Sequence, residues 1–375
     1  MIYSEMKVLI FHTALAPYRV DFFNKLGERI DLRVIFLTRN NANQAFDQSK
    51  LLKEATYTYG YLDNHYTLWG RNINFGYSKE IEKFNPDIVI CNEFAQSTLS
   101  CFCHRLLKNQ KYKIFTICDD SEDIFENRKG LRKFLSHFFA SHLDGMICIN
   151  PKVANKYLQL GARIVSLFPI IYHESSYRQK LSKALTYTDM YIDRFELTGC
   201  KCLIFVGRLT EVKNLRNLLK CYSIVNNYIC EKLKLILVGD GDLKLTLQQD
   251  CIDLGISEDV IFAGRYEGDE LYAWYNLNGI FILPSIYEPF GAVVGEALMA
   301  GMPAIVSDKV GAKCLIDKTN GLIFDSSSID DMAIAVKTML KRNASIGHKS
   351  SVRSSILPYH FDSLMNNLLH DFEAC

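Results

Sequence analysis

The stretch PSIYEPFGAVVGEALMAGMPAIVSD, residues 284–308, follows the apolar run GIFILPS and leads through a small-residue turn into a helix and then a second strand. Strands that are separated by helices favour a parallel sheet with helices on both faces. The turn Pro289-Phe290-Gly291 would present backbone amides where the helix begins, at about Ala292. Such free amides at a helix N-terminus favour an anion.

Two carboxylates, Glu288 and Glu296, flank this turn. They would repel a phosphate, but each can accept two hydrogen bonds from vicinal hydroxyls. The pattern therefore predicts a ligand with hydroxyls on both sides of its phosphates, such as a nucleotide sugar. The alternative is an ordinary loop charge and a helix-surface charge. Glu296 argues against this, because it lies among Gly295, Ala297 and Leu298, where an unpaired carboxylate is costly.

Working outward from this stretch, strand and helix patterns alternate in both halves of the chain. We expect an α/β protein with two doubly wound Rossmann-like domains. The predicted N-terminal domain covers residues 1–170, with a C-terminal helix at about 356–375 packing back onto it. A polar, Tyr-rich linker is expected at 171–199, and the second domain covers 200–355.

The bulk composition agrees with two soluble domains. The chain has 375 residues, 49% of them hydrophobic and 23% charged, with a net charge of +1. This charge gives no global attraction to nucleic acid. The twelve cysteines are scattered in apolar segments without metal-type spacing, and no window of the sequence reaches the length of a membrane span. We expect a reduced, cytoplasmic protein.

The segment FVGRLTEVKNL brings cations to a second strand end. Gly207 permits a tight exit from the strand, and Arg208 and Lys213 follow before a helix that begins near Asn214. Two cations beside a helix N-terminus suit a diphosphate. A solvated loop with ordinary surface charges is the alternative.

The segment VGDGDL contains a Gly-x-Gly turn, Gly239 and Gly241, in which the backbone could approach a ligand closely. Gly-Asp-Gly-Asp is also a common tight turn. Asp240 and Asp242 leave a metal-diphosphate site open as an alternative.

GRLTEVKN, VGDGDL and EPFGAVVGEALMAGMPAIVSD, in this order and spacing, resemble the donor domain of the retaining, nucleotide-sugar-dependent glycosyltransferases of family four. These group 1 enzymes have the GT-B fold, two Rossmann-like domains facing a central cleft. The resemblance covers residues 200–345, and its most specific element is a Glu, seven residues and a second Glu.

The resemblance also implies roles for individual residues. Arg208 and Lys213 would clamp the diphosphate, and Glu288 would bind the transferred sugar. The amides of Phe290 and Gly291 would hold sugar or phosphate, and Glu296 would bind the ribose. Gly207 and Gly239 complete the donor site. No metal or other cofactor is implied, because the cations and the helix dipole take the place of a metal.

The N-terminal domain is expected to bind the acceptor. His12, Tyr18 and Arg19 follow the first strand, although His12 can equally be a packed histidine at a strand end. Where many relatives have a histidine, this sequence has FTICDDSED. Asp120 could contact acceptor or donor sugar, or an acidic loop could simply cap the next helix.

The segment RKGLRKFLSHFFASHL places Leu131, Phe134, Leu135, Phe138 and His142 on one stripe, opposite Arg128, Lys129, Arg132 and Lys133. A basic amphipathic helix can lie on an anionic membrane. We favour the commoner alternative, a helix packed on its sheet with a solvated basic face. A peripheral membrane contact remains open.

The leading interpretation is a retaining hexosyltransferase. It would move a sugar from a nucleotide-diphospho sugar, by default a UDP-sugar, to a glycan or lipid-linked oligosaccharide acceptor in polysaccharide assembly. Three rivals remain: a metal-dependent transferase using Asp240 and Asp242, a nicotinamide oxidoreductase with Gly239 and Gly241 in a dinucleotide turn, and a non-catalytic sugar-nucleotide binding module. The oxidoreductase pattern lacks its third glycine and its later acid.

Overall fold

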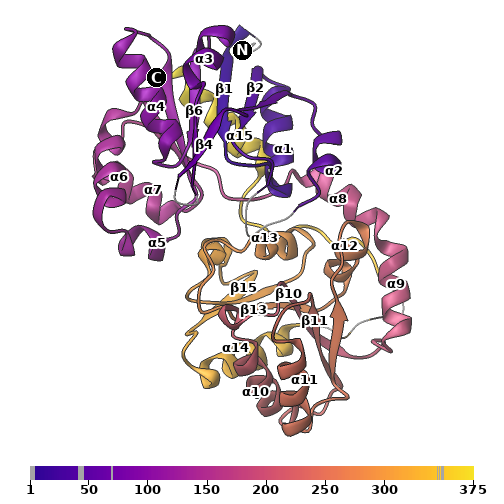
Figure 1. The fold of residues 1–375 in the computed structure, drawn as a ribbon. Coiled ribbons are helices and arrows are strands. Elements are labelled where there is room, and N and C mark those ends of the chain that lie inside the picture. Colours follow the sequence, from indigo (N-terminus) through magenta and orange to yellow (C-terminus); the bar gives the residue numbers. More distant parts are fainter. Residues whose placement is uncertain (1–4, 41–45, 69–70, 344, 346, 348–349) are drawn as a thin grey trace. The chain divides into compact units, whose positions relative to one another are not determined.

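The computed structural model describes residues 5–40, 46–68, 71–343, 345, 347 and 350–375. The chain divides into two compact units (Figure 1). Unit 1 comprises Met1–Ile170 and Phe361–Cys375, and unit 2 comprises Ile171–His360. Each unit is built around a parallel sheet, so the predicted α/β class is confirmed.

Unit 1 contains a seven-stranded sheet of order β3-β2-β1-β6-β7-β8-β9, in which all neighbouring strands are parallel. Its strands are β1 (Lys7–His12), β2 (Asp31–Phe36), β3 (Thr58–Tyr61), β6 (Ile88–Asn92), β7 (Lys113–Cys118), β8 (Gly145–Cys148) and β9 (Val165–Leu167). The order reverses at β1, which pairs with both β2 and β6. Separately, β4 (His65–Leu68) and β5 (Arg71–Asn74) form an antiparallel ribbon.

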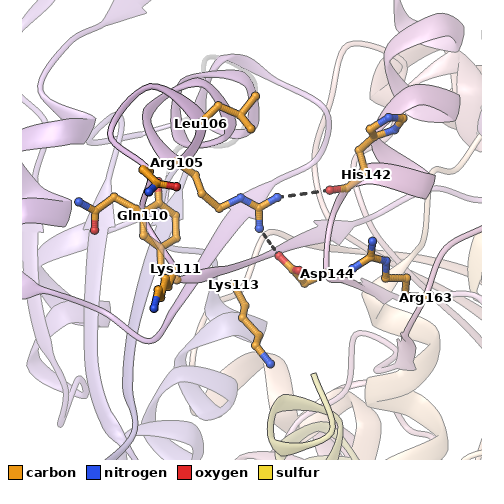
Figure 2. Close-up of a pocket in the computed structure, with 10 residues that line it drawn as sticks. Arg105, Leu106, Gln110, Lys111, Lys113, His142, Asp144 and Arg163 are labelled. Atoms are coloured by element: carbon orange, nitrogen blue, oxygen red, sulfur yellow. Dashed lines mark hydrogen bonds and ion pairs between the residues drawn. The ribbon is translucent and has the colours of Figure 1, made fainter.

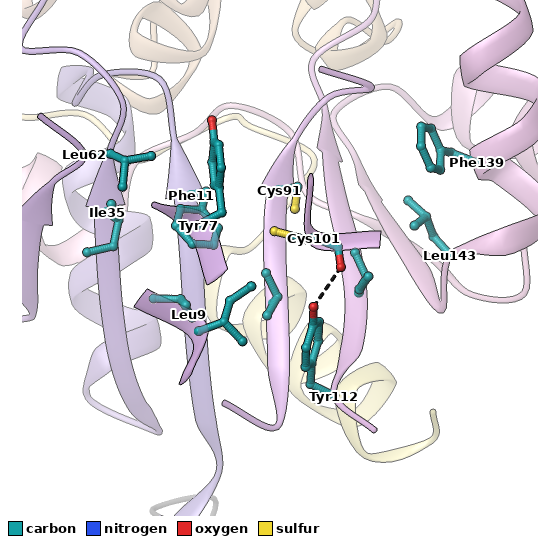
Figure 3. Packing of buried hydrophobic residues seen from close by; sticks show 13 residues of the cluster. Leu9, Phe11, Ile35, Leu62, Tyr77, Cys91, Cys101, Tyr112, Phe139 and Leu143 are labelled. Carbon is teal, nitrogen blue, oxygen red and sulfur yellow. Dashed lines mark hydrogen bonds between the residues drawn. The ribbon is translucent and has the colours of Figure 1, made fainter. Parts of the chain in front are cut away.

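The helices of unit 1 are α1 (Pro17–Gly27), α2 (Gln48–Lys53), α3 (Tyr77–Phe84), α4 (Gln96–Leu107), α5 (Glu122–Asn127), α6 (Gly130–His142), α7 (Pro151–Gln159) and α15 (Phe361–Glu373). Continuous apolar strands such as IVIC in β6 are buried because helices cover the sheet. Figure 3 shows part of this core, where the Tyr112 hydroxyl donates to the Cys101 carbonyl at 2.7 Å.

Unit 2 contains a six-stranded parallel sheet of order β12-β11-β10-β13-β14-β15. Its strands are β10 (Lys201–Val206), β11 (Leu233–Val238), β12 (Val260–Gly264), β13 (Ile280–Leu283), β14 (Ala304–Ser307) and β15 (Gly321–Phe324). Its helices are α8 (Glu174–Lys183), α9 (Leu185–Arg194), α10 (Leu215–Asn226), α11 (Lys244–Asp253), α12 (Asp269–Asn276), α13 (Ala292–Met299) and α14 (Ile329–Arg342). The 3₁₀ turns η2 (Glu211–Lys213) and η3 (Gly311–Leu315) lie in its loops.

The structure places residues 171–199, expected as a linker, inside unit 2. Most of them form α8 and α9, which pack on α12. Tyr191, for example, stacks on Trp274 with ring centroids 4.4 Å apart. The apolar periodicity is weak here because tyrosines supply much of the contact surface.

The last helix starts at Phe361 rather than near residue 356, and it lies in unit 1. Phe361 packs edge-on against Phe168 at 5.1 Å, and Phe372 packs against Phe115 at 4.9 Å. None of the described helices combines the length and apolarity needed to cross a bilayer.

Candidate functional site

The sheet of unit 2 reverses its strand order at β10, which pairs with β11 on one side and β13 on the other. Connections to neighbouring strands therefore leave in opposite directions from the carboxyl ends of β10 and β13. In open α/β sheets, ligands bind at this kind of switch point. The loop after β10 contains Arg208 and Lys213, and the loop after β13 contains Glu288.

The loop after β10 is held by local turns. Leu209 is buried, its amide donates to the Asp240 carbonyl at 2.9 Å, and η2 carries Lys213 into the start of α10. Arg208 is exposed and makes no ion pair within the described part of the chain. The buried hydroxyl of Thr210 likewise has no hydrogen-bond partner among the described residues.

The Lys213 ammonium forms an ion pair with the Glu288 carboxylate, and both side chains are mostly buried. A backbone hydrogen bond of 2.9 Å from the Ile286 amide to the Val212 carbonyl ties the same two loops together. The structure thus brings together two of the three residues that we predicted to be catalytic. Low exposure strengthens their attraction relative to a surface pair.

The turn that begins the next helix has the geometry expected from the sequence. Helix α13 starts at Ala292, and Gly291 caps it with a φ of 90°. A β-carbon at Gly291 would lie 3.0 Å from a Leu283 methyl group and 3.1 Å from the Glu288 Cγ. Phe290 is buried, and its carbonyl accepts a hydrogen bond of 2.6 Å from the Ala312 amide. The Val294 amide donates to the carbonyl of the capping Gly291 at 3.0 Å, and the amides ahead of it, at Ala292 and Val293, precede the first acceptor that the helix offers.

The loop after β14 forms backbone hydrogen bonds with the turn that precedes α13. The Glu288 amide donates to the Lys309 carbonyl at 3.3 Å, and the Gly311 amide donates to the Glu288 carbonyl at 3.0 Å. A β-carbon at Gly311 would lie 2.1 Å from the Pro289 carbonyl oxygen. The backbone that carries Glu288 is therefore fixed by close packing.

The structure gives a packing reason for glycine at position 239, which the sequence alone did not reveal. A β-carbon added at Gly239 would lie 1.8 Å from the Gly207 carbonyl oxygen. A β-carbon added at Gly241 would lie 2.5 Å from the Leu209 carbonyl oxygen. These glycines let the loops after β10 and β11 pack backbone to backbone. Close approach of a ligand is not needed to explain them.

Glu296 does not face solvent in this structure; only 8% of it is exposed. Its Oε1 accepts a hydrogen bond from the Tyr172 hydroxyl at 2.9 Å, and its Oε2 accepts one from Tyr275 at 2.7 Å. Burial raises the pKa of Glu296. Two protein hydroxyls thus already engage the carboxylate that we expected to bind the ribose, and its ribose role stays a prediction. The alternative of a helix-surface charge is wrong.

In unit 1, His12 lies at the carboxyl end of β1 and is 7% exposed. Its ring packs edge-on against Phe23, and its Nδ1 donates to the Ala14 carbonyl at 3.0 Å. Burial, with the nearby Arg19 charge, lowers the pKa of His12 to about 4. The ring is therefore neutral at pH 7, as expected for a packed strand-end histidine.

Internal ion pairs occupy two other predicted acceptor residues. Arg19 is 2% exposed and donates to Asp119 at 2.6 Å. Asp120 is also 2% exposed; it pairs with Arg128 and accepts a hydrogen bond from the Tyr157 hydroxyl at 3.0 Å. The predicted acceptor contacts of Arg19 and Asp120 are corrected to structural roles. The helix cap is Ser121, not Asp120.

Tyr18 is partly buried beside this cluster. Burial, followed by the nearby Asp119 charge, raises the pKa of Tyr18. Of the four predicted acceptor residues, Tyr18 is the one that the structure leaves free of an internal ion pair or a buried packing role.

Among the described residues, Asp240 and Asp242 are not joined by further side chains that could bind a metal ion. Asp240 accepts a hydrogen bond of 2.9 Å from the Gly241 amide, and Lys244 lies 4.0 Å away. Within the part of the chain that the structure describes, no three Asp, Glu, His or Cys side chains gather around a common point.

Three residues of the site were missed from the sequence: Tyr172, Tyr275 and Thr210. Tyr172 and Tyr275 are distant in sequence from Glu296, so only the fold brings them to it. The tyrosine-rich composition of residues 171–199 was the available signal. No pattern distinguishes Thr210 from other loop hydroxyls.

Known proteins resemble this chain in part of its sequence and in its fold. Residues 194–351 match the model of the family described as glycosyl transferases group 1. An uncharacterized glycosyltransferase of Methanocaldococcus jannaschii is 34% identical over 142 residues, which cover 37% of this chain and 36% of that protein. The alpha-monoglucosyldiacylglycerol synthase of Streptococcus pneumoniae is 25% identical over 66% of this chain and 59% of its own length. The chain thus matches only part of these relatives.

Among solved structures, Anabaena Alr3699/HepE in complex with UDP aligns with a TM-score of 0.73 and 14% identity. The alignment covers 99% of this chain and 100% of that one. At this identity the likeness establishes the fold.

Proposed function

We propose that the whole chain is a retaining glycosyltransferase, because residues 194–351 match the model of the glycosyl transferases group 1 family. It moves a sugar from a nucleotide-diphospho sugar to a glycan or lipid-linked oligosaccharide in cell-surface polysaccharide assembly. A UDP-sugar is favoured, because the solved relative Alr3699/HepE was crystallised with UDP. A lipopolysaccharide core biosynthesis glycosyltransferase of Rhizobium meliloti, 25% identical over 56% of this chain, supports the acceptor class.

The ion pair between Lys213 and Glu288 is the observation on which the proposal rests. It sits at the switch point, next to the exposed Arg208 and the first turn of α13. A diphosphate bound there meets two cations, free helix amides and the unpartnered Thr210 hydroxyl. Glu288 holds the Lys213 side chain in place until phosphate oxygens compete for it.

The chemistry follows from fixed positive charge. Negative charge builds on the diphosphate as the bond to the sugar breaks, and Arg208 and Lys213 stabilise it without reorganising. The Glu288 carboxylate accepts hydrogen bonds from sugar hydroxyls, with amides of Phe290 and Gly291 beside it. In the proposed reaction the acceptor hydroxyl attacks from the face that the leaving group vacates, so the anomeric configuration is retained.

The proposed reaction needs no metal, since these cations supply the neutralising charge. We place it in the reducing cytoplasm. All twelve cysteines are free thiols in the structure, which supports that assignment.

Calorimetric titration with a panel of nucleotides, followed by transfer assays with the matching sugar nucleotides, tests the proposal. We expect binding of a nucleoside diphosphate and transfer that persists in excess chelator. The NMR coupling constant of the product should report a retained anomeric configuration. The absence of binding across the panel would contradict the proposal.

The two rival functions give different outcomes in the same assays. Activity that is lost in EDTA and restored by manganese would favour a metal site at Asp240 and Asp242. A non-catalytic binding module would bind the donor without any hydrolysis or transfer.

A further inference from the structure

Helix α6 exposes part of its apolar stripe, Leu131 and Phe134, whereas Leu135 and Phe138 pack against the core of unit 1. Its buried residues are Ser136, Phe139 and Ala140, whereas Leu131 is 71% and Phe134 is 64% exposed. Phe134 stacks on Phe138 at 6.2 Å, and this stripe borders solvent. The favoured expectation of a packed apolar stripe is therefore confirmed for Leu135 and Phe138 but wrong for Leu131 and Phe134.

Helix α4 extends this surface. Phe102 packs edge-on against Phe138 at 5.9 Å and lies 6.5 Å from the His142 ring, so the two helices are in contact. Leu99 and Leu106 lie three residues before and four residues after Phe102, on the same helix face. We call the exposed apolar residues of these helices the α4–α6 face: Leu99, Leu106, Leu107, Leu131 and Phe134.

The segments that form the α4–α6 face carry only positive charge, although Glu82 of the neighbouring α3 lies 4.0 Å from Lys108. Residues 96–118 contain four lysines and arginines, residues 128–143 contain another four, and neither segment contains a carboxylate side chain. Arg128 pairs internally with Asp120, but Lys129, Arg132 and Lys133 are exposed. This concentration of cations contrasts with the net charge of +1 for the whole chain.

A basic cavity of about 340 Å³ adjoins the end of α4 (Figure 2). Arg105, Lys113 and Arg163 surround Asp144, and Lys111 and His142 are also among the lining residues. Arg105 pairs with Asp144, whereas Lys113 and Arg163 form no ion pair within the described residues. The cavity therefore carries a surplus of positive charge.

This basic cavity is separate from the residues predicted to bind sugar. It lies where β7 and β8 begin, at the amino edge of the sheet of unit 1. His12, Arg19 and Asp120 lie at the carboxyl edge of that sheet. The cavity is thus a second anion-binding candidate with no part in the predicted acceptor site.

We propose that the α4–α6 face docks on the surface of an anionic lipid bilayer and that the basic cavity receives a lipid phosphate. The exposed leucines and phenylalanine of the two helices can enter the interfacial region of the bilayer. The charged groups of the lysines and arginines then remain level with the lipid phosphates. A contiguous exposed apolar patch marks an interaction surface. The surrounding cations outnumber the acids that pair with them, Glu82, Asp120 and Asp144, and this surplus complements a uniformly anionic partner.

Vesicle sedimentation tests this proposal on the full chain without any donor or acceptor. We expect binding to vesicles of phosphatidylcholine and phosphatidylglycerol that is at least about tenfold stronger than binding to phosphatidylcholine alone and that weakens at high salt. The double variants Leu106→Glu/Phe134→Glu and Lys111→Glu/Lys133→Glu should each lose about tenfold or more of this binding.

Matched controls separate docking from folding. Leu245→Glu alters a residue of α11 in unit 2 that is 79% exposed, and Lys53→Glu alters an exposed cation at the end of α2. Both controls should bind vesicles like the wild type. All variants alter exposed residues, so their circular dichroism and melting temperatures should match the wild type.

Three results would overturn the proposal: equal binding to both kinds of vesicle, binding of inorganic phosphate without vesicle binding, or a dimer that Leu106→Glu/Phe134→Glu dissociates while vesicle binding is unchanged. The transfer reaction is tested separately. Activity on a water-soluble acceptor should be unchanged in these variants, so failure of one proposal does not imply failure of the other.

Discussion

At the scale of single residues, the role of a carboxylate in this protein depends on the side chains that surround it. Glu288 lies beside Lys213 in a loop at a strand end, where a ligand can compete for either partner. Glu296, eight residues later, is enclosed by two tyrosine hydroxyls. The same residue type therefore serves a predicted site in one case and holds the fold together in the other.

Lys213→Ala should lower kcat about 10² to 10³-fold, because the developing diphosphate charge loses a fixed partner. Steady-state kinetics with the preferred donor would measure the loss. Arg216→Ala is the matched control: it removes a nearby cation, in the first turn of α10, that pairs with Asp250 at 2.8 Å. Near-normal kcat in Lys213→Ala would contradict the diphosphate clamp.

Glu296→Ala should cost about 2–4 kcal/mol of folding free energy, because the buried hydroxyls of Tyr172 and Tyr275 lose their acceptor. Glu296→Gln should cost clearly less, since an amide can accept from one tyrosine and donate to the other. Urea denaturation measures both values. Weakened donor affinity with unchanged stability in Glu296→Ala would support the ribose role predicted from the sequence.

His12 should make folding stability sensitive to acid. Its pKa is about 4 in the folded protein and about 6.5 when unfolded, so the unfolded chain binds more protons between these values. Stability should therefore fall by about 2–3 kcal/mol as the pH drops from 6.5 to 4. His12→Asn should remove this part of the pH dependence, and the exposed His137→Asn should not. Equal slopes in the two variants would refute the assignment.

At the scale of elements, the loops of unit 2 depend on glycines that permit backbone contact. Gly239 has a φ of 144°, and a β-carbon there would overlap the Gly207 carbonyl. The fit is between loops that follow neighbouring strands, β10 and β11. It fixes the position of the segment that carries Arg208 and Lys213.

Gly239→Ala should therefore disrupt unit 2 by more than about 3 kcal/mol or prevent folding, because a backbone atom cannot move aside as a flexible side chain can. Gly255→Ala is the control: its φ is 65°, but a β-carbon there meets no atom within 4 Å. That variant should lose only about 1 kcal/mol. Thermal melts compare the two, and equal melting temperatures would contradict the packing explanation.

At the scale of the whole molecule, the chain leaves unit 1 after Ile170 and returns to it at Phe361. Helix α15 completes the core of unit 1 with its buried face, which includes Phe361, Leu368 and Phe372. Unit 1 is thus assembled from the two ends of the sequence, and its stability depends on the last helix.

Phe372→Ala should destabilise unit 1 by about 3–4 kcal/mol, because Phe372 is 3% exposed and packs on Phe115. Asn367→Ala, at an exposed position of the same helix, should be nearly neutral. Hydrogen exchange of β7 amides would report the change locally. Unaltered exchange in Phe372→Ala would show that α15 contributes little to the core.

The sequence by itself determined the α/β class, the strand ends that carry Arg208, Lys213 and Glu288, and the start of α13 at Ala292. Those features depend on the spacing of apolar residues and on turn-forming residues, so a short segment of sequence is enough to predict them. Strands β3 and β15 were not predicted, because each includes a glycine and is only partly buried, so neither shows the continuous apolar run of a central strand. Only the tertiary structure decided which charges are free. Glu296 and Arg19 are bound by residues 21 to 124 positions away, and Asp120 by Arg128, which follows α5. No local pattern records such partners.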